Sequence, residues 1–106
     1  MKQVEILYRH SQTSEKAIEK YLVKEAERRG MLCLKYSNQN MTGFPDRILL
    51  CKESRVIWVE VKSVNGRLNP IQKIRMDQLT EMGHLVKVVW SRKDVDELFN
   101  LIDGEL

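Results

Sequence analysis

Residues 56–62 of the chain read Val-Ile-Trp-Val-Glu-Val-Lys. This stretch is almost wholly β-branched or aromatic until its charges begin, a composition typical of strands. We therefore expect a strand that lies in the middle of a sheet. Because side chains alternate across a strand, Glu60 and Lys62 project from one face while Val59 and Val61 project from the other. An acid and a base thus lie side by side where this strand ends.

Three stretches with helical spacing of apolar residues predict helices. The first covers residues 15–29 and follows Ser14, a typical N-cap residue. The second begins at Asn69-Pro70, a good N-cap with a first-turn proline, and ends before Gly83. The third covers residues 93–102. The apolar side of the second helix is predicted to include Ile71, Ile74, Gln78 and Met82.

Three further stretches predict strands, over residues 32–36, 47–51 and 85–90. The order along the chain is helix, three strands, helix, strand, helix. Three strands in close succession favour an antiparallel meander, whereas the helical connection to the last strand permits a parallel pairing. The pattern predicts an α/β fold around a mixed sheet.

Composition limits the classes of protein that need be considered. A chain of 106 residues fits one domain, so residues 1–106 are expected to form a single unit. Hydrophobic residues make up 42% of the chain, and no apolar run is long enough to span a membrane. The N-terminus has no secretory character, and the two cysteines lie apart with no second Cys or His at ligand spacing, so neither a disulfide framework nor a zinc site is indicated. We expect a cytoplasmic protein without a membrane partner, and the net charge of +3 is compatible with binding a polyanion.

A second acid precedes the 47–51 strand. Residues 43–46 read Gly-Phe-Pro-Asp, and a Gly-x-Pro turn would hold Asp46 in a fixed direction. If the second and third strands form a hairpin through residues 52–55, Asp46 converges on Glu60. An isolated Glu-x-Lys pair is more often a solvated surface pair, and a lone turn aspartate is common. Two convergent carboxylates beside Lys62 are far more specific, because they suit Mg²⁺ binding and phosphodiester hydrolysis.

This constellation resembles the signature of the PD-(D/E)XK nuclease superfamily: Asp46, a spacer of thirteen residues, then Glu60-Val61-Lys62. Pro45-Asp46 supplies the first two letters of the motif. Together with residues 43–48, the stretch Gly-Arg-Leu-Asn-Pro-Ile-Gln at 66–72 is similar to the VRR-NUC family of that superfamily. The likeness spans roughly residues 14–100 and is strongest to short members from phages and bacteria.

The resemblance implies a restriction-endonuclease-like fold, Mg²⁺ as cofactor, with Mn²⁺ able to replace it, and a set of site residues. Asp46 and Glu60 would be metal ligands, and the mechanism that we expect adds the Val61 carbonyl as a further candidate ligand. Lys62 would be the catalytic lysine, and Gln72 would order the site by hydrogen bonding, although an exposed glutamine is nearly as common at such a position. Hydrolysis would need no nucleotide, in keeping with the lack of a Gly-x-x-x-x-Gly-Lys loop.

The resemblance also implies an acid on the first helix. Glu15 and Glu19 are four residues apart and so lie on one helix face. Glu15 is favoured as the metal ligand and Glu19 is the alternative; the other acid would be a solvated helix residue.

Basic residues near this site could contact DNA. Arg67 and Lys73 flank it and are candidates for phosphate contacts, although most such charges are simply solvated. Arg9, His10 and Lys16 could extend the same surface.

The resulting hypothesis is a metal-dependent, structure-selective DNA endonuclease. Stand-alone members of the family it resembles are dimeric Holliday-junction resolvases, so we expect a symmetric homodimer that acts on branched DNA. Met41, Phe44 and Met76 are candidate interface residues. The alternatives are a flap-directed or general DNA nuclease, and a non-catalytic nucleic-acid-binding module on the same fold.

Overall fold

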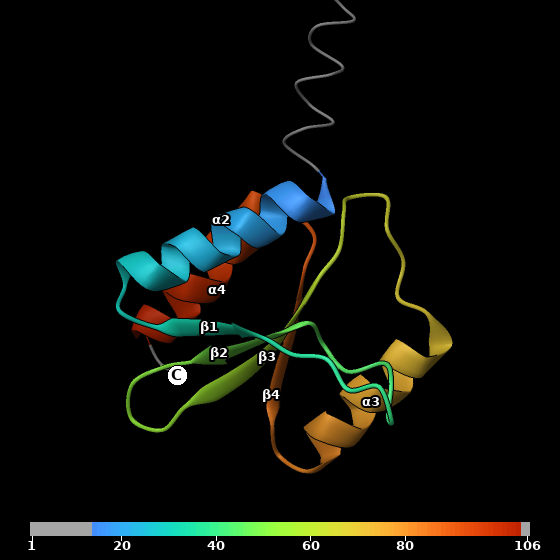
Figure 1. Cartoon of the computed structure of the whole chain (residues 1–106). Helices are drawn as coiled ribbons and strands as arrows, with labels where there is room; N and C mark the ends of the chain where they lie inside the picture. The colour runs from blue at the N-terminus through green and yellow to red at the C-terminus, as the bar shows by residue number, and fades with distance from the viewer. Residues whose placement is uncertain (1–13, 105–106) are drawn as a thin grey trace, which may run out of the picture.

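The computed structural model describes residues 14–104, which form three helices and four strands (Figure 1). Each predicted element is confirmed, and every boundary lies within two residues of its expected place. Among the described residues, no helix is long and apolar enough to cross a membrane. The elements are, in chain order, α2 (Glu15–Arg28), β1 (Leu32–Lys35), β2 (Arg47–Leu50), β3 (Val56–Val61), α3 (Pro70–Glu81), β4 (Leu85–Val89) and α4 (Arg92–Gly104).

The four strands form one mixed sheet in the order β1-β2-β3-β4. β1, β2 and β3 pair antiparallel, and β4 pairs with β3 in parallel after the α3 crossover. β3 is an interior strand, as its composition predicted. In the β2–β3 pairing Arg47 lies opposite Val59, so the residue before Arg47 lies beside Glu60. The expected hairpin is therefore confirmed.

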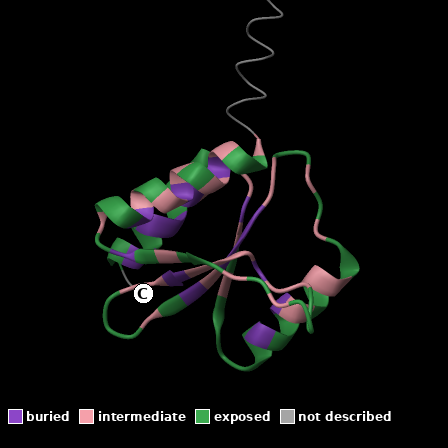
Figure 2. Ribbon diagram, viewed as in Figure 1, coloured by how far each residue is buried: buried purple, intermediate pink, exposed green. Residues whose placement is uncertain are grey.

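α2 and α4 cover one face of the sheet and enclose the main core (Figures 1 and 2). Ile18 and Leu22 of α2 and Phe99 of α4 are completely buried there, against Leu49 and Val59 of the sheet. The even-numbered residues of β3, including Glu60, project from the opposite face because side chains alternate. Glu60 therefore lies on the face of the sheet that does not carry the main core.

α3 lies on the second face, next to β4. The predicted apolar side of this helix is wrong: Met76 and Leu79 are its buried residues, whereas Ile74 is 49% and Met82 67% exposed. The reason is that α3 contacts the sheet mainly along β4, so only a narrow line of its surface is covered. Its ends follow the prediction, since Asn69 caps the first turn.

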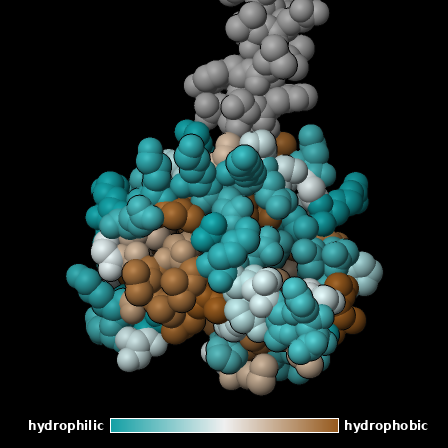
Figure 3. Space-filling view, in the orientation of Figure 1, coloured by the Kyte–Doolittle hydropathy of each residue, from teal (hydrophilic) through white to brown (hydrophobic). Residues whose placement is uncertain are grey.

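The part of the second face that α3 does not reach remains apolar and exposed. Leu32 and Leu34 of β1 are 61% and 45% exposed, and Val56 of β3 is exposed on the same side. Figure 3 shows hydrophobic surface gathered over these strands. Patches of this kind on a small domain often mark a contact with another molecule.

Candidate active site

Asp46 is positioned by the loop between β1 and β2. The Tyr36 amide donates a hydrogen bond to the Asp46 carbonyl oxygen (2.7 Å), which extends the β1–β2 pairing up to the aspartate. Earlier in the loop, Gly43 has a φ of +96°, and a Cβ atom there would lie 2.9 Å from Cγ1 of Ile71 in α3. The Gly-x-Pro turn therefore lets the loop pack against α3 and brings Asp46 to the end of the sheet.

Glu60 is the buried acid of the site, only 2% exposed. Its Oε2 accepts a hydrogen bond from Gln72 Nε2 (3.3 Å) and lies 3.8 Å from Lys62 Nζ. Within residues 14–104, Oε1 of Glu60 is buried without any hydrogen-bond partner. Burial and the nearby charge of Asp46 raise the pKa of Glu60 to about 7, against the opposing effects of Lys62 and of the Asp46 backbone N–H. Asp46, Glu60 and Lys62 are thus brought together.

Gln72 connects this acid to the start of α3. Its backbone amide donates to Asn69 Oδ1 and its own Oε1 accepts from the Asn69 amide, both at 2.9 Å, which is a capping box. Its Nε2 remains free to donate to Glu60. Both polar atoms of the Gln72 side-chain amide are therefore hydrogen-bonded, Oε1 to the Asn69 amide and Nε2 to Glu60.

The two acids of α2 have different surroundings. Glu19 Oε2 accepts hydrogen bonds from Arg47 Nε (2.8 Å) and Lys35 Nζ (3.0 Å), both on the sheet. Burial would raise the pKa of Glu19, but these two cations outweigh it and hold the pKa below the usual value. Glu15 is exposed at the first turn of α2, and its charge contributes to the raised pKa of Glu60. Glu19 is thus occupied by two cations, and Glu15 stays the favoured candidate for the helix ligand.

The remaining predicted residues lie around this centre. Val61 is buried at the end of β3, between the two charged residues. Arg67 lies on the connection between β3 and α3, and Lys73 lies in the first turn of α3. Both side chains are exposed, and neither forms an ion pair with any other residue in the described part of the chain. Arg9 and His10 lie outside the described residues.

The donor set fits a hard divalent cation. Asp46 and Glu60 supply carboxylate oxygens, and the unpartnered Oε1 of Glu60 is a buried acceptor that a cation would satisfy. Among residues 14–104, no group of three or more His, Cys, Asp or Glu side chains is close enough to hold a metal ion. A site with two carboxylates suits Mg²⁺, which commonly keeps several water ligands.

Comparisons with known proteins agree with this geometry. The family profile of the VRR-NUC domain matches residues 4–93. The chain belongs to the VRR-NUC family. A solved structure described as a VRR-NUC domain superposes with a TM-score of 0.78 at 30% identity, covering 89% of this chain and 99% of that one. The restriction-endonuclease-like α/β fold expected from the resemblance is thus confirmed.

A phage relative points in the same direction. "Putative nuclease p44" of Acyrthosiphon pisum secondary endosymbiont phage 1 is 32% identical over 78 residues, which are 74% of this chain and 84% of that protein. VRR-NUC membership and this relative together support a nuclease.

Several features of this VRR-NUC domain were missed by sequence reasoning. Trp58 projects from the same strand face as Glu60 and packs edge-on against Tyr36, with ring centroids 5.3 Å apart. Met76 lies on the buried side of α3, so its candidacy as an exposed interface residue is wrong. Lys16 was a candidate for DNA contact, but its regular spacing with Lys20 and Lys24 on α2 was missed, although that spacing is visible in the sequence.

Proposed function

We propose that this protein is a Mg²⁺-dependent DNA endonuclease that hydrolyses phosphodiester bonds. The observation that carries the proposal is the unpartnered, buried Oε1 of Glu60, beside Asp46 and with Lys62 Nζ 3.8 Å from Oε2. Asp46 and Glu60 would hold the cation, with the Val61 carbonyl and Glu15 as further candidate ligands. When bound, Mg²⁺ supplies a Lewis acid for the phosphate and lowers the pKa of water.

The chain's own side chains have separate tasks in this mechanism. Lys62 places an ammonium group beside the carboxylates, where it stabilises the negative charge that develops on the phosphate oxygens. Gln72 holds Glu60 in one orientation, so that the carboxylate is preorganised for the cation. Arg67 and Lys73 are proposed phosphate contacts on either side of the scissile bond.

Calorimetry with Mn²⁺ tests the site independently of turnover. The wild-type protein is expected to bind Mn²⁺, and Asp46→Ala is expected to weaken the affinity about 100-fold or more, because a direct carboxylate ligand is lost. Asp77→Ala, which removes an exposed acid from α3, is the matched control and should bind as wild type does. Failure of the wild-type protein to bind either Mn²⁺ or Mg²⁺ would favour the non-catalytic nucleic-acid-binding module.

We further propose a C₂ homodimer that acts on four-way junctions. One chain carries one site, whereas symmetric cutting of a junction needs two. Support comes from the exposed apolar face formed by Leu32, Leu34 and Val56, which carries no charge and could pack against its own copy. A flap-directed or general nuclease is the alternative, since either could work as a monomer.

Light scattering and a substrate panel test this assembly. The wild-type protein should be a dimer at micromolar concentration, and Leu34→Glu should weaken the dimer at least about 100-fold by burying a charge at the contact. Ile74→Glu, an equally exposed apolar position on α3, should leave the dimer intact. A wild-type monomer that cuts linear duplex and four-way junction at equal rates would eliminate the junction-resolving dimer.

A further inference from the structure

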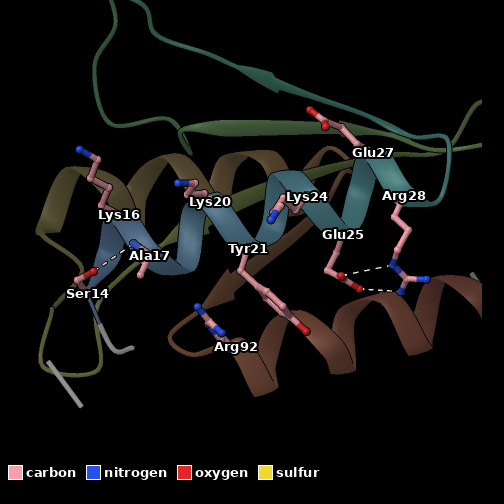
Figure 4. A pocket seen from close by; sticks show the side chains of 10 residues that line it. All are labelled: Ser14, Lys16, Ala17, Lys20, Tyr21, Lys24, Glu25, Glu27, Arg28 and Arg92. Carbon is pink, nitrogen blue, oxygen red and sulfur yellow. Dashed lines mark hydrogen bonds and ion pairs between the residues drawn. The ribbon is translucent and has the colours of Figure 1, made fainter. Parts of the chain in front are cut away.

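The outer side of α2 carries a row of three lysines. Lys16, Lys20 and Lys24 follow one another at intervals of four residues, which places them along one side of a helix. Figure 4 shows their side chains spread along the helix, away from the sheet. With a rise of about 1.5 Å per residue, the row is about 12 Å long. We call these three residues the lysine row.

The charge of the lysine row is not compensated within the domain. None of its three side chains forms an ion pair or a side-chain hydrogen bond with any residue between 14 and 104. Of the other acids on α2, Glu19 binds the sheet and Glu25 binds Arg28 and Arg29 at 2.8 Å each, whereas Glu15 and Glu27 form no ion pair within residues 14–104. The row therefore presents exposed positive charge with no acid bound to it.

A fourth cation lies across a hollow from this row. The guanidinium of Arg92, the first residue of α4, lies 5.1 Å from the centroid of the Tyr21 ring. The Tyr21 hydroxyl in turn donates a 2.6 Å hydrogen bond to Asp96. The lysine row, Tyr21 and Arg92 line an open hollow of about 1120 Å³, whose lining also includes Glu25, Glu27 and Arg28 (Figure 4). Stacking on the ring restricts Arg92, so less freedom is lost when it meets an anion.

Lys16, the first residue of the row, directly follows Glu15, the candidate metal ligand at the start of α2. A polyanion that runs along the row would therefore pass from the site along α2. One DNA strand advances about 3.4 Å along the helix axis per phosphate, so a length of about 12 Å matches three or four phosphates.

We propose that the lysine row and Arg92 bind the phosphate backbone of the DNA substrate on one side of the scissile bond. This inference rests on the proposed nuclease function for the identity of the polyanion. Contacts of this type position the substrate without reading its bases. They add affinity and salt dependence, and leave the chemical step to Asp46, Glu60 and Lys62.

Fluorescence anisotropy with labelled DNA in EDTA measures this contribution without cleavage. The test variant is Lys16→Gln/Lys20→Gln/Lys24→Gln, because glutamine keeps a helix propensity similar to that of lysine. The matched control is Lys52→Gln/Lys87→Gln/Lys93→Gln, which removes three exposed lysines that also lack ion pairs within the described part of the chain. Both variants lower the net charge by three, so they differ only in where charge is lost.

The test variant should bind a four-way junction and a linear duplex about 100-fold more weakly than wild type at 0.1 M salt. The slope of log affinity against log salt concentration should fall by about three, roughly one for each lysine. The control should lose only a few-fold in affinity. If the triple variant does not fold, Lys20→Gln alone should lower the slope by about one.

Equal weakening of both variants would assign the effect to net charge and overturn the proposal, as would an unchanged slope in the test variant. Binding of wild type to phosphatidylserine vesicles but not to DNA would also overturn it. If wild type binds DNA through the lysine row but cuts nothing, the row is supported and the proposed nuclease function fails.

Discussion

Glu60→Gln and Lys62→Ala are each expected to abolish DNA cleavage, by about 1000-fold or more in kcat, while DNA binding should stay near the wild-type affinity. Glutamine lacks the charge that a divalent cation needs at this buried position. Alanine removes the ammonium that lies 3.8 Å from Glu60 and would stabilise the charge of the transition state. Binding is largely retained because it draws on many phosphate contacts, whereas turnover depends on these few groups.

Single-turnover cleavage of a labelled substrate measures the effect, with anisotropy on the same DNA as the binding assay. Glu53→Gln and Lys52→Ala are matched controls, since they change the same residue types at the exposed β2–β3 turn. Both controls should cut at nearly the wild-type rate. Substantial residual turnover by purified Glu60→Gln or Lys62→Ala would remove these residues from the catalytic centre.

Without metal, Glu60→Gln is expected to make the protein more stable at pH 8, by about 3 kcal/mol in the free energy of unfolding. The pKa of Glu60 is raised to about 7 in the folded protein, by burial first and then by Asp46, from the 4.5 of an ordinary glutamate carboxyl. The folded state therefore holds this proton more tightly than the unfolded state. The stability that this bound proton adds to the folded state is fully present below about pH 4.5, and it is lost as the pH rises through 7. Each pKa unit corresponds to about 1.36 kcal/mol.

Urea unfolding in EDTA at pH 5 and pH 8 measures this dependence. The advantage of Glu60→Gln over wild type should shrink from about 3 kcal/mol at pH 8 to about 1 kcal/mol at pH 5, where most of the Glu60 carboxyl is already protonated in the folded state. Glu53→Gln controls for removal of a carboxylate and should show no such change. An equal stability difference at both pH values would contradict a buried, unpaired carboxylate at position 60.

The convergence of Asp46, Glu60 and Lys62 was predictable because it follows from local rules. Side-chain alternation places Glu60 and Lys62 on one face, and the short turn at residues 52–55 fixes the register that brings Asp46 opposite Glu60. The same rules predicted the interior position of β3. These features depend on the chain's covalent geometry and on neighbouring strands only.

The buried side of α3 was not predictable by the same means. Ile74 and Met82 are as apolar as Met76, and only the narrow contact with β4 decides which of them is covered. The choice between Glu15 and Glu19 is similar, because both lie on one face of α2. It is Arg47 and Lys35, distant in sequence, that engage Glu19. Contacts with residues that are distant in the chain leave no local pattern in the sequence from which they could be predicted.

The double attachment of Gln72 restricts which amino acid can occupy that position. A capping box accepts glutamate as readily as glutamine, since either side chain can accept a hydrogen bond from the Asn69 amide. A glutamate at position 72 would keep the helix start, but it would turn a second carboxylate toward Glu60 Oε2 in place of an N–H donor. Helix stability alone cannot distinguish the two amino acids, so the preference for glutamine here is imposed by the acid on the neighbouring strand.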